Sequence, residues 1–205
     1  MAAIRDLDTF FFSDYDEISQ TLVREEIFRF LSTSDSLVTT SHNLDILDIL
    51  CESFGYSQDI LIVKKDNKFE GFMPLIIISG LGTRIVSMPH FSYGGYLGKN
   101  DLTQKQHFHL IEIIRKKHGD NVLIRDFKEI SDFTSTEKVS CFLELEDSSE
   151  KQFTGFSSKL RSQIRKATKN GLFVEESTLE SFYPIYVNNM HRLGSPHISK
   201  TFFHN

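Results

Sequence analysis

The chain has 205 residues, of which 40% are hydrophobic and 25% are charged, and its formal net charge is −5 at pH 7. This composition is ordinary for a globular protein, and the length suits one full domain and part of a second. The acidic balance argues against a dedicated nucleic-acid-binding protein and against DNA as a partner, although it does not exclude a local basic patch.

The amino terminus and the cysteines predict a cytoplasmic protein that is not transmembrane. The first residues, MAAIRDLDTFFF, lack the positive-then-apolar order of a secretory signal. The longest apolar run, residues 73–78, is far too short to cross a bilayer. Cys51 and Cys141 fall in apolar patterns without CxxC spacing, which indicates inert core residues in a reducing compartment.

Helix and strand patterns alternate over the first three quarters of the chain. Asp66 and Asn67 predict the turn of a hairpin, and Pro74 in its second strand indicates a bulge or an edge position. The order of elements predicts an α+β fold, with helices flanking a mixed, largely antiparallel sheet. The predicted elements are helix 18–31, helix 43–54, strand 59–65, strand 69–79, strand 83–88, helix 102–118, strand 121–126 and strand 138–145.

Alternation on the strands and helical spacing also predict the buried side chains of this first domain. They are Leu61, Val63, Phe72, Leu75, Ile77, Val86, Leu110, Ile114, Leu123 and Phe142. The acidic, polar step EDSSE, at residues 146–150, predicts a boundary between a first domain over residues 1–146 and a second over residues 147–205.

The second domain is predicted to begin with a basic helix, a short strand and a further helix. The basic helix follows the apolar spacing of residues 153–167, with a break near Gly155. Ser177 and Glu180 fit a capping box for the further helix. A third helix opens shortly before residue 205, so this domain is expected to be incomplete and to expose apolar side chains.

Positive charge is concentrated on the predicted basic helix, where six basic residues occur without an acid. At 100° per residue, Arg161, Arg165 and Lys169 form one stripe, and Lys159 and Lys166 lie on the other flank. Composition leaves two readings open: a solvated amphipathic face, or a site for an anion. An anion site requires Arg161 and Arg165 to be partly exposed and not saturated by carboxylate partners.

The loop over residues 88–97 combines paired glycines with aromatic side chains and follows the strand that Pro89 ends. One reading is a bulged crossing of the sheet, packed under aromatic rings. The other is a substrate-facing loop, in which Tyr93 forms a hydrogen-bonding wall while Gly94 and Gly95 leave room for the substrate.

Motifs for common cofactors are missing from the sequence. The run from Gly80 to Gly82 lacks the third glycine of a dinucleotide loop, and no phosphate-binding loop, HExxH pair or paired CxxC is present. The eight histidines do not cluster in metal-ligand spacing, so no metal is expected.

Three segments carry a family resemblance: SMPHFSYGGYL, FSSKLRSQIRKATKNGL and FYPIYVNNMHRLGSPHISKTFF. The most specific part is the pattern KxRxxIRKAxKxG from Lys159 to Gly171. Together they resemble the FemAB-like branch of the GNAT acyltransferase superfamily, which comprises peptidoglycan-bridge aminoacyltransferases and exopolysaccharide-associated relatives. The RLGSP run is most similar to the exopolysaccharide-associated subgroup.

The resemblance implies two GNAT-like domains in tandem, with the acceptor held near their junction. It implies transfer of an acyl group onto an amine, from an acyl-CoA or an aminoacyl-tRNA, without a metal. The acceptor would be an anionic precursor used in cell-envelope biogenesis. Substrate contacts are carried over to the basic side chains of the motif and to the glycine loop. These are Lys159, Arg161, Arg165, Lys166, Tyr93, Gly94 and Gly95.

Two departures limit the resemblance. His191 and Arg192 share the place where relatives often carry one basic residue before the LGxP run. A donor loop of the RxxGxG/A kind does not occur within residues 1–205, so no catalytic residue is assigned and this stretch alone is expected to be inactive. The alternative hypothesis is a non-catalytic adaptor whose basic helix binds RNA or an acidic partner.

Overall fold

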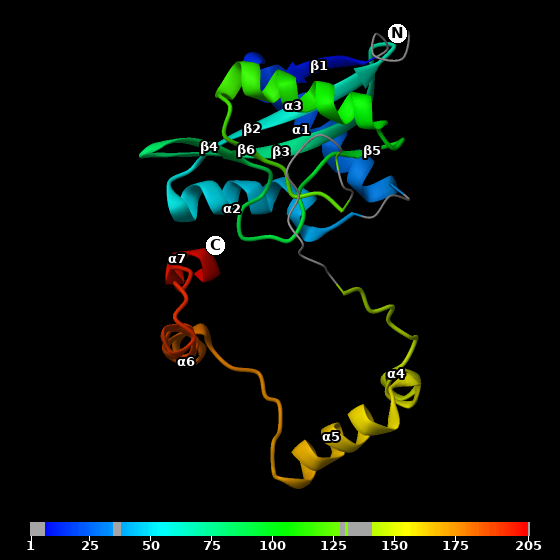
Figure 1. Cartoon of the computed structure of the whole chain (residues 1–205), viewed down its shortest axis with the longest axis vertical. Coiled ribbons are helices and arrows are strands. Elements are labelled where there is room, and N and C mark those ends of the chain that lie inside the picture. Colours follow the sequence, from blue (N-terminus) through cyan, green and yellow to red (C-terminus); the bar gives the residue numbers. More distant parts are fainter. Residues whose placement is uncertain (1–6, 35–37, 128–129, 131–140, 205) are drawn as a thin grey trace. The chain divides into compact units, whose positions relative to one another are not determined.

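The computed structural model describes residues 7–34, 38–127, 130 and 141–204. By their internal contacts the residues form two compact units, one of residues 1–137 with 201–205 and the other of residues 138–200. The α+β class is confirmed, and Figure 1 labels the elements along the chain. The strands are β1 (Asp8–Phe11), β2 (Ser57–Lys65), β3 (Lys68–Gly80), β4 (Gly82–Val86), β5 (Leu97–Gly98) and β6 (Val122–Leu123). The helices are α1 (Glu17–Thr33), α2 (Leu44–Phe54), α3 (Gln104–His118), α4 (Ser149–Gly155), α5 (Ser158–Lys169), α6 (Leu179–Arg192) and α7 (Lys200–His204).

The first unit is built on one sheet with the strand order β1-β2-β3-β4-β6, and β5 also pairs with β3. The strands from β1 to β5 pair antiparallel, whereas β6 is parallel to β4 and places Val122 opposite Ile85. A parallel pair needs a long crossover, and α3 supplies it. The predicted mixed, largely antiparallel sheet is therefore confirmed.

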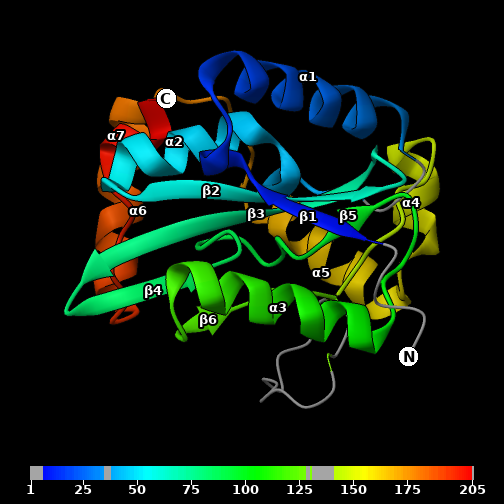
Figure 2. The same cartoon turned by 90° about the horizontal axis from the view of Figure 1, so that it is seen from above.

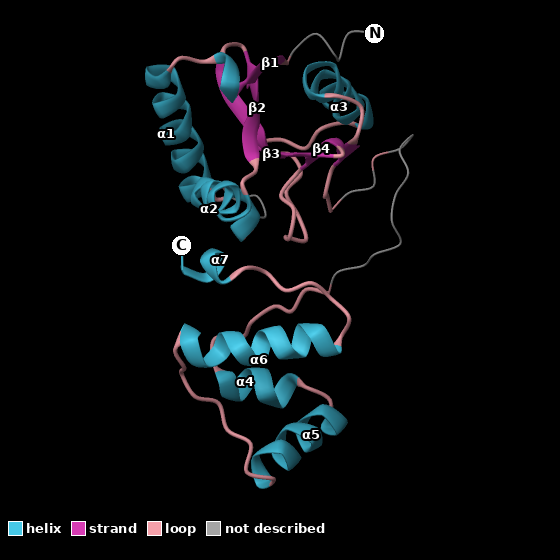
Figure 3. Ribbon diagram, turned by 90° about the vertical axis from the view of Figure 1, so that its left-hand side faces the viewer, coloured by secondary structure: helices cyan, strands magenta, loops and turns pink. Residues whose placement is uncertain are grey.

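Helices cover both faces of this sheet. In Figure 2 and Figure 3, α1 and α2 lie on one face and α3 lies on the other. Successive side chains of β2 alternate between the two faces, as the pleat of a strand requires. Ile60 and Ile62 belong to the core beneath α1 and α2, whereas Leu61 and Val63 belong to the core beneath α3. One strand therefore serves two separate cores.

The hairpin between β2 and β3 confirms the predicted two-residue turn. Asp66 and Asn67 have φ angles of 50° and 58°, the left-handed values that a tight hairpin turn needs. A bulge follows, because Val63 pairs with Gly71 while Lys64 pairs with Phe69.

Pro74 does not form this bulge. It pairs with Ile60, deep in β3. On its other side β3 pairs with β5 through residues 71–72 and with β4 through residues 76–80. Pro74 thus falls between two short partners, where its missing N–H removes no ladder hydrogen bond.

Most of the predicted core is confirmed, with three exceptions. Seven of the predicted side chains are buried, and Ile77 and Leu123 are half-buried. The strand predicted over residues 138–145 is wrong for residues 141–145, which are exposed and form no regular structure, and its first three residues lie outside the described part. Phe142 is 64% exposed, and Cys141 is exposed instead of buried.

The second unit consists of helices without a buried side chain among its described residues. The predicted break in the basic helix is confirmed, because α4 ends at Gly155 and Ser157 caps α5. The short strand predicted after it is wrong, since residues 172–178 form none. The next helix, α6, is capped by Thr178 instead of Ser177. The predicted domain boundary, with a second domain that begins at residue 147, stays a prediction.

The exposed apolar side chains expected in this unit are confirmed, and examples are Phe173 at 78% and Val174, which is fully exposed. Over the described part of the chain, no helix is both long and apolar enough to cross a bilayer.

Candidate functional site

The first candidate site of the chain lies at the carboxyl ends of β4 and β6. The parallel ladder continues past β4, where the backbone N–H of Ser87 donates to the carbonyl oxygen of Leu123 at 3.0 Å. Because parallel strands leave a sheet at the same edge, the segment after β4 and the segment after β6 meet there. In open sheets this edge is where ligands bind.

Arg125, just after β6, holds the glycine loop, which we define as residues 88–97. Its carbonyl oxygen accepts from the backbone N–H of Gly94 at 2.9 Å, and its Nη1 donates to the carbonyl oxygen of Phe91 at 2.6 Å. Its backbone N–H donates to the hydroxyl oxygen of Ser87 at 2.7 Å. Two hydrogen bonds to Arg125 therefore hold the loop itself, and a third holds Ser87, the residue just before it.

The paired glycines allow the loop to pack closely against the protein. A Cβ on Gly94 would lie 2.6 Å from the Cβ of Met88, and a Cβ on Gly95 would overlap the carboxylate of Asp126. Both glycines are buried, so the room they leave is filled by protein side chains. This geometry favours the packed-crossing reading, and substrate contact by Gly94 and Gly95 stays a prediction.

Tyr93 is half-buried and stacks on Phe127 with the ring centroids 3.7 Å apart. Its ring therefore packs beside the loop that follows β6. The predicted role of Tyr93 as a wall for substrate stays a prediction.

The loop begins with backbone strain. Met88 and His90 have φ angles of 57° and 69°, which side chains with a Cβ rarely adopt. Each such residue costs on the order of 1–3 kcal/mol and persists only where the surroundings enforce it. Met88 is fully buried, and the ring of His90 stacks on Phe54 at 4.6 Å. Strain of this kind is concentrated at functional sites, which is a second reason to place a site here.

A buried polar cluster supports the loop from below. Nε2 of His42 donates to the carbonyl oxygen of Gly95 at 3.3 Å, since a carbonyl oxygen can only accept, and Nδ1 of His42 lies 3.0 Å from Oγ1 of Thr39. Burial lowers the pKa of His42. Nε2 of His107 lies 3.9 Å from Oδ2 of Asp126. Sequence reasoning missed this cluster, because its members come from distant segments.

Tyr96 lies beside this cluster. Its hydroxyl sits against Gly71 and Gly98, where a Cβ on either glycine would overlap it. Burial raises the pKa of the Tyr96 phenol. Tyr96 is therefore a tightly packed side chain that keeps its phenol proton at ordinary pH.

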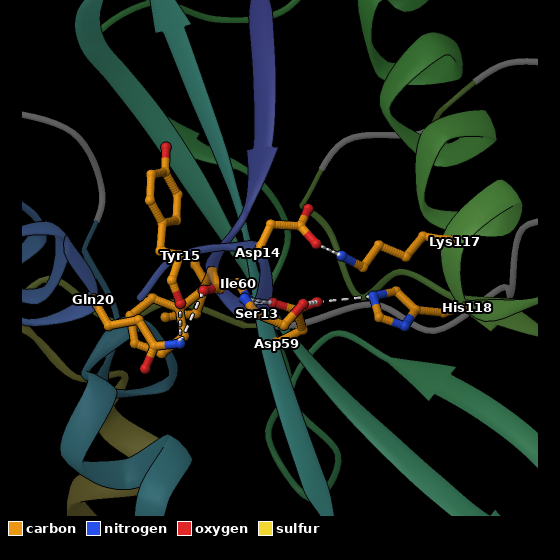
Figure 4. Close-up of polar contacts among 9 residues, drawn as sticks. Ser13, Asp14, Tyr15, Gln20, Asp59, Ile60, Lys117 and His118 are labelled. Carbon is orange, nitrogen blue, oxygen red and sulfur yellow. Dashed lines mark hydrogen bonds and ion pairs between the residues drawn. The ribbon is translucent and has the colours of Figure 1, made fainter. Parts of the chain in front are cut away.

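A second polar cluster, centred on Asp59, holds elements of the first unit together (Figure 4). Its carboxylate accepts from the N–H and the hydroxyl of Ser13 at 3.0 and 2.8 Å, and Nε2 of His118 lies 3.0 Å from Oδ2. Lys117 pairs with Asp14 beside it. The carboxylate stands between Ser13 and His118, so the histidine has no hydrogen bond to the serine and cannot act as its general base. The cluster joins the short helical turn after β1, which carries Ser13 and Asp14, to β2 and α3.

The four motif cations lie on α5 in the second unit. Lys159, Arg165 and Lys166 are exposed, and Arg161 is half-buried. Nη1 of Arg161 donates to the carbonyl oxygen of Thr154 at 2.9 Å, so the guanidinium is directed toward α4. Among the described residues none of the four forms a salt bridge with a carboxylate.

Arg165 also lies over an aromatic ring, with its guanidinium carbon 5.2 Å from the centroid of Phe153. This contact holds the side chain without neutralising it. The exposure and lack of carboxylate partners expected for Arg161 and Arg165 are therefore observed, and the predicted site residues form two groups, one in each unit.

Comparison with known proteins gives no match: no family model, curated protein or solved structure is similar to this chain. Among the described residues, no group of three or more His, Cys, Asp or Glu side chains is suited to a metal ion.

Proposed function

We propose that this chain is the N-terminal part of a FemAB-like acyltransferase. The whole enzyme would transfer an acyl or aminoacyl group, from an acyl-CoA or an aminoacyl-tRNA, to an amine. The acceptor would be an anionic precursor of peptidoglycan or an exopolysaccharide, modified in the cytoplasm. The proposal rests on the resemblance of the motif from Lys159 to Gly171, together with the features below.

The observation that carries the proposal concerns the cations of α5. Its cations occupy the positions that the resemblance assigns to the substrate, and no described carboxylate neutralises them. Arg161 and Arg165 are four residues apart and share one face of α5. Guanidinium groups bind phosphates and carboxylates through paired hydrogen bonds, so an anionic precursor suits this face.

The fold of the first unit agrees with the proposal. A meander of antiparallel strands ends in the crossover from β4 through α3 to the parallel strand β6. This is a mixed, largely antiparallel sheet with helices on both faces, as a GNAT-like domain requires. The strained glycine loop lies where that parallel pair ends.

The proposed reaction needs no redox partner. The amine nitrogen attacks the carbonyl carbon of the activated acyl group and forms a C–N bond. The bond from that carbon to the sulfur of CoA, or to the ribose oxygen of tRNA, breaks, and the proton lost by the nitrogen neutralises the leaving thiolate or alkoxide. The protein would accelerate this step by holding the two reactants together and by stabilising the negative oxygen of the tetrahedral intermediate.

Titration calorimetry with a nucleotide-linked cell-wall peptide that carries a free amine tests the acceptor part of the proposal. The chain should bind this precursor, and Arg165→Ala should weaken the binding roughly tenfold or more, because a charge-assisted contact is lost. Lys116→Ala on α3, an exposed cation of the first unit, is the matched control and should bind as the wild type does.

Equal affinity of the wild type and Arg165→Ala would contradict the proposal and return α5 to a solvated face. The transfer step is tested separately, by mass spectrometry of the acceptor after incubation with each donor. Residues 1–205 should give no acylated product. Turnover by this chain would show that the catalytic centre lies within it, contrary to the proposal.

A further inference from the structure

The segment after α5 exposes apolar side chains next to the basic helix. Leu172, Phe173 and Val174 follow the Asn170–Gly171 turn that ends α5, form no strand and are 68%, 78% and fully exposed. Figure 1 shows this segment as an extended connection between α5 and α6. Three consecutive exposed apolar residues are unusual on a protein surface and mark a surface that contacts something else.

The basic helix adds an apolar stripe of its own. Leu160 and Ile164 are 40% and 39% exposed, and they lie on one face of α5. Arg161 and Lys159 flank Leu160, each about 100° around the helix from it. Cations in this position can extend their charged ends outward while their stems cover apolar surface.

We infer that α5 and residues 172–174 bind the surface of a membrane that contains anionic lipids. A basic arc on a helix, combined with adjacent exposed apolar side chains, is the pattern of segments that lie in the headgroup region. A soluble phosphate would account for the cations but not for Phe173. The inference uses the same cations as the proposed acceptor site, but it does not rest on the transfer chemistry, because vesicle binding is measured without donor or acceptor.

Charge complementarity selects the membrane over a neutral partner. Residues 158–169 carry five cations and no acid, in a chain with a net charge of −5. Attraction to an anionic surface is therefore local to α5. The remainder of the chain, which is acidic in sum, is repelled, so the contact orients the second unit toward the lipid.

Flotation of the whole chain with lipid vesicles tests the inference. The wild type should bind vesicles of phosphatidylcholine with phosphatidylglycerol and ignore vesicles of phosphatidylcholine alone. Each cation near an anionic surface strengthens binding about fivefold, so Arg161→Gln with Arg165→Gln should weaken it roughly 30-fold. Lys105→Gln with Lys116→Gln, two exposed cations of α3, removes the same charge and should leave binding unchanged.

The apolar part has its own readout, because the chain contains no tryptophan. Phe173→Trp places a single fluorophore in the apolar segment, and its emission should shift to the blue on addition of anionic vesicles. Phe28→Trp on α1, a position with 71% exposure, is the matched control and should show no shift. Circular dichroism of each variant establishes that the helices are retained.

Several results would overturn the inference. They are absence of vesicle binding, equal loss of binding in the α3 control, and an unshifted emission from Phe173→Trp. Binding of single-stranded RNA or inorganic pyrophosphate without vesicle binding would also overturn it, in favour of a soluble ligand. Gel filtration that shows a dimer dispersed by Phe173→Ser, again without vesicle binding, would overturn it in favour of a second copy of the chain.

Discussion

Asp59 and His118 are joined by a 3.0 Å contact between a carboxylate oxygen and Nε2, although they lie 59 residues apart. The carboxylate of Asp59 is 1% exposed, and its oxygens also accept hydrogen bonds from Ser13 and from its neighbour Ile60. A buried carboxylate with this many partners is an anchor, since each partner would be left unsatisfied without it.

Asp59→Asn should therefore destabilise the protein by roughly 2–4 kcal/mol, because buried donors lose a charged acceptor. Urea unfolding followed by circular dichroism measures this. Asp45→Asn, at an exposed position on α2, should change the stability by less than about 0.5 kcal/mol. A loss at Asp59 no larger than at Asp45 would show that the network contributes nothing.

Gly95→Ala should destabilise the first unit, because the added methyl group would overlap the Asp126 carboxylate. Overpacking of this kind costs about 1–3 kcal/mol. Gly80→Ala is the control, since a Cβ there meets nothing within 4 Å and its φ is not left-handed. Thermal unfolding compares the two variants, and equal melting temperatures would mean that the glycine loop accommodates the added methyl group without a loss of stability.

The pH dependence of stability follows from His42. Burial lowers its pKa in the folded state, so below the ordinary histidine pKa of about 6.5 the unfolded chain binds the proton first. Stability should therefore fall as the pH drops below that value, until the folded pKa is reached.

His90 contributes in the same direction, because burial and the charge of Arg125 lower its pKa. Urea unfolding of the wild type and of His42→Asn between neutral and mildly acidic pH measures the effect. The variant should lose less stability over this range. Parallel curves for the two proteins would assign the acid sensitivity to other groups.

The helices of the second unit should exchange their amide hydrogens far faster than β2 and β3. Among its described residues α5 buries no side chain, and an isolated helix of its length is marginal in water. Hydrogen exchange followed by mass spectrometry tests this directly. Protection of α5 equal to that of β3 in the isolated chain would show that a partner surface already covers it.

The sequence predicts the elements whose signals are local. Asn43 and Gly55 bound α2 as a side-chain cap and a left-handed terminator, with φ of 67° at the glycine. The strand β1 was not predicted, because four residues contain too little alternation and its partner lies in β2. Of the strand predicted over 138–145, the described residues 141–145 have alternation but pair with no strand, so alternation alone does not form a sheet.

The same distinction between local and long-range signals applies to the candidate site. The glycine loop was recognisable from its composition, but the residues that fix it were not, because Arg125 and His42 reach it only through the crossover and the packing of α2. The exposure of the α5 cations was predictable, since it follows from the helical period and from the absence of nearby acids.

The double use of β2 restricts how this protein can vary. Because neighbouring side chains of β2 enter different cores, deletion of one residue from the strand would send Ile62 toward α3 and Val63 toward α2. Substitution of either residue would disturb one core and leave the other in place. The damage from a change of side chain along this strand is thus confined to one core, whereas a change of chain length disturbs both and is tolerated only in the loops.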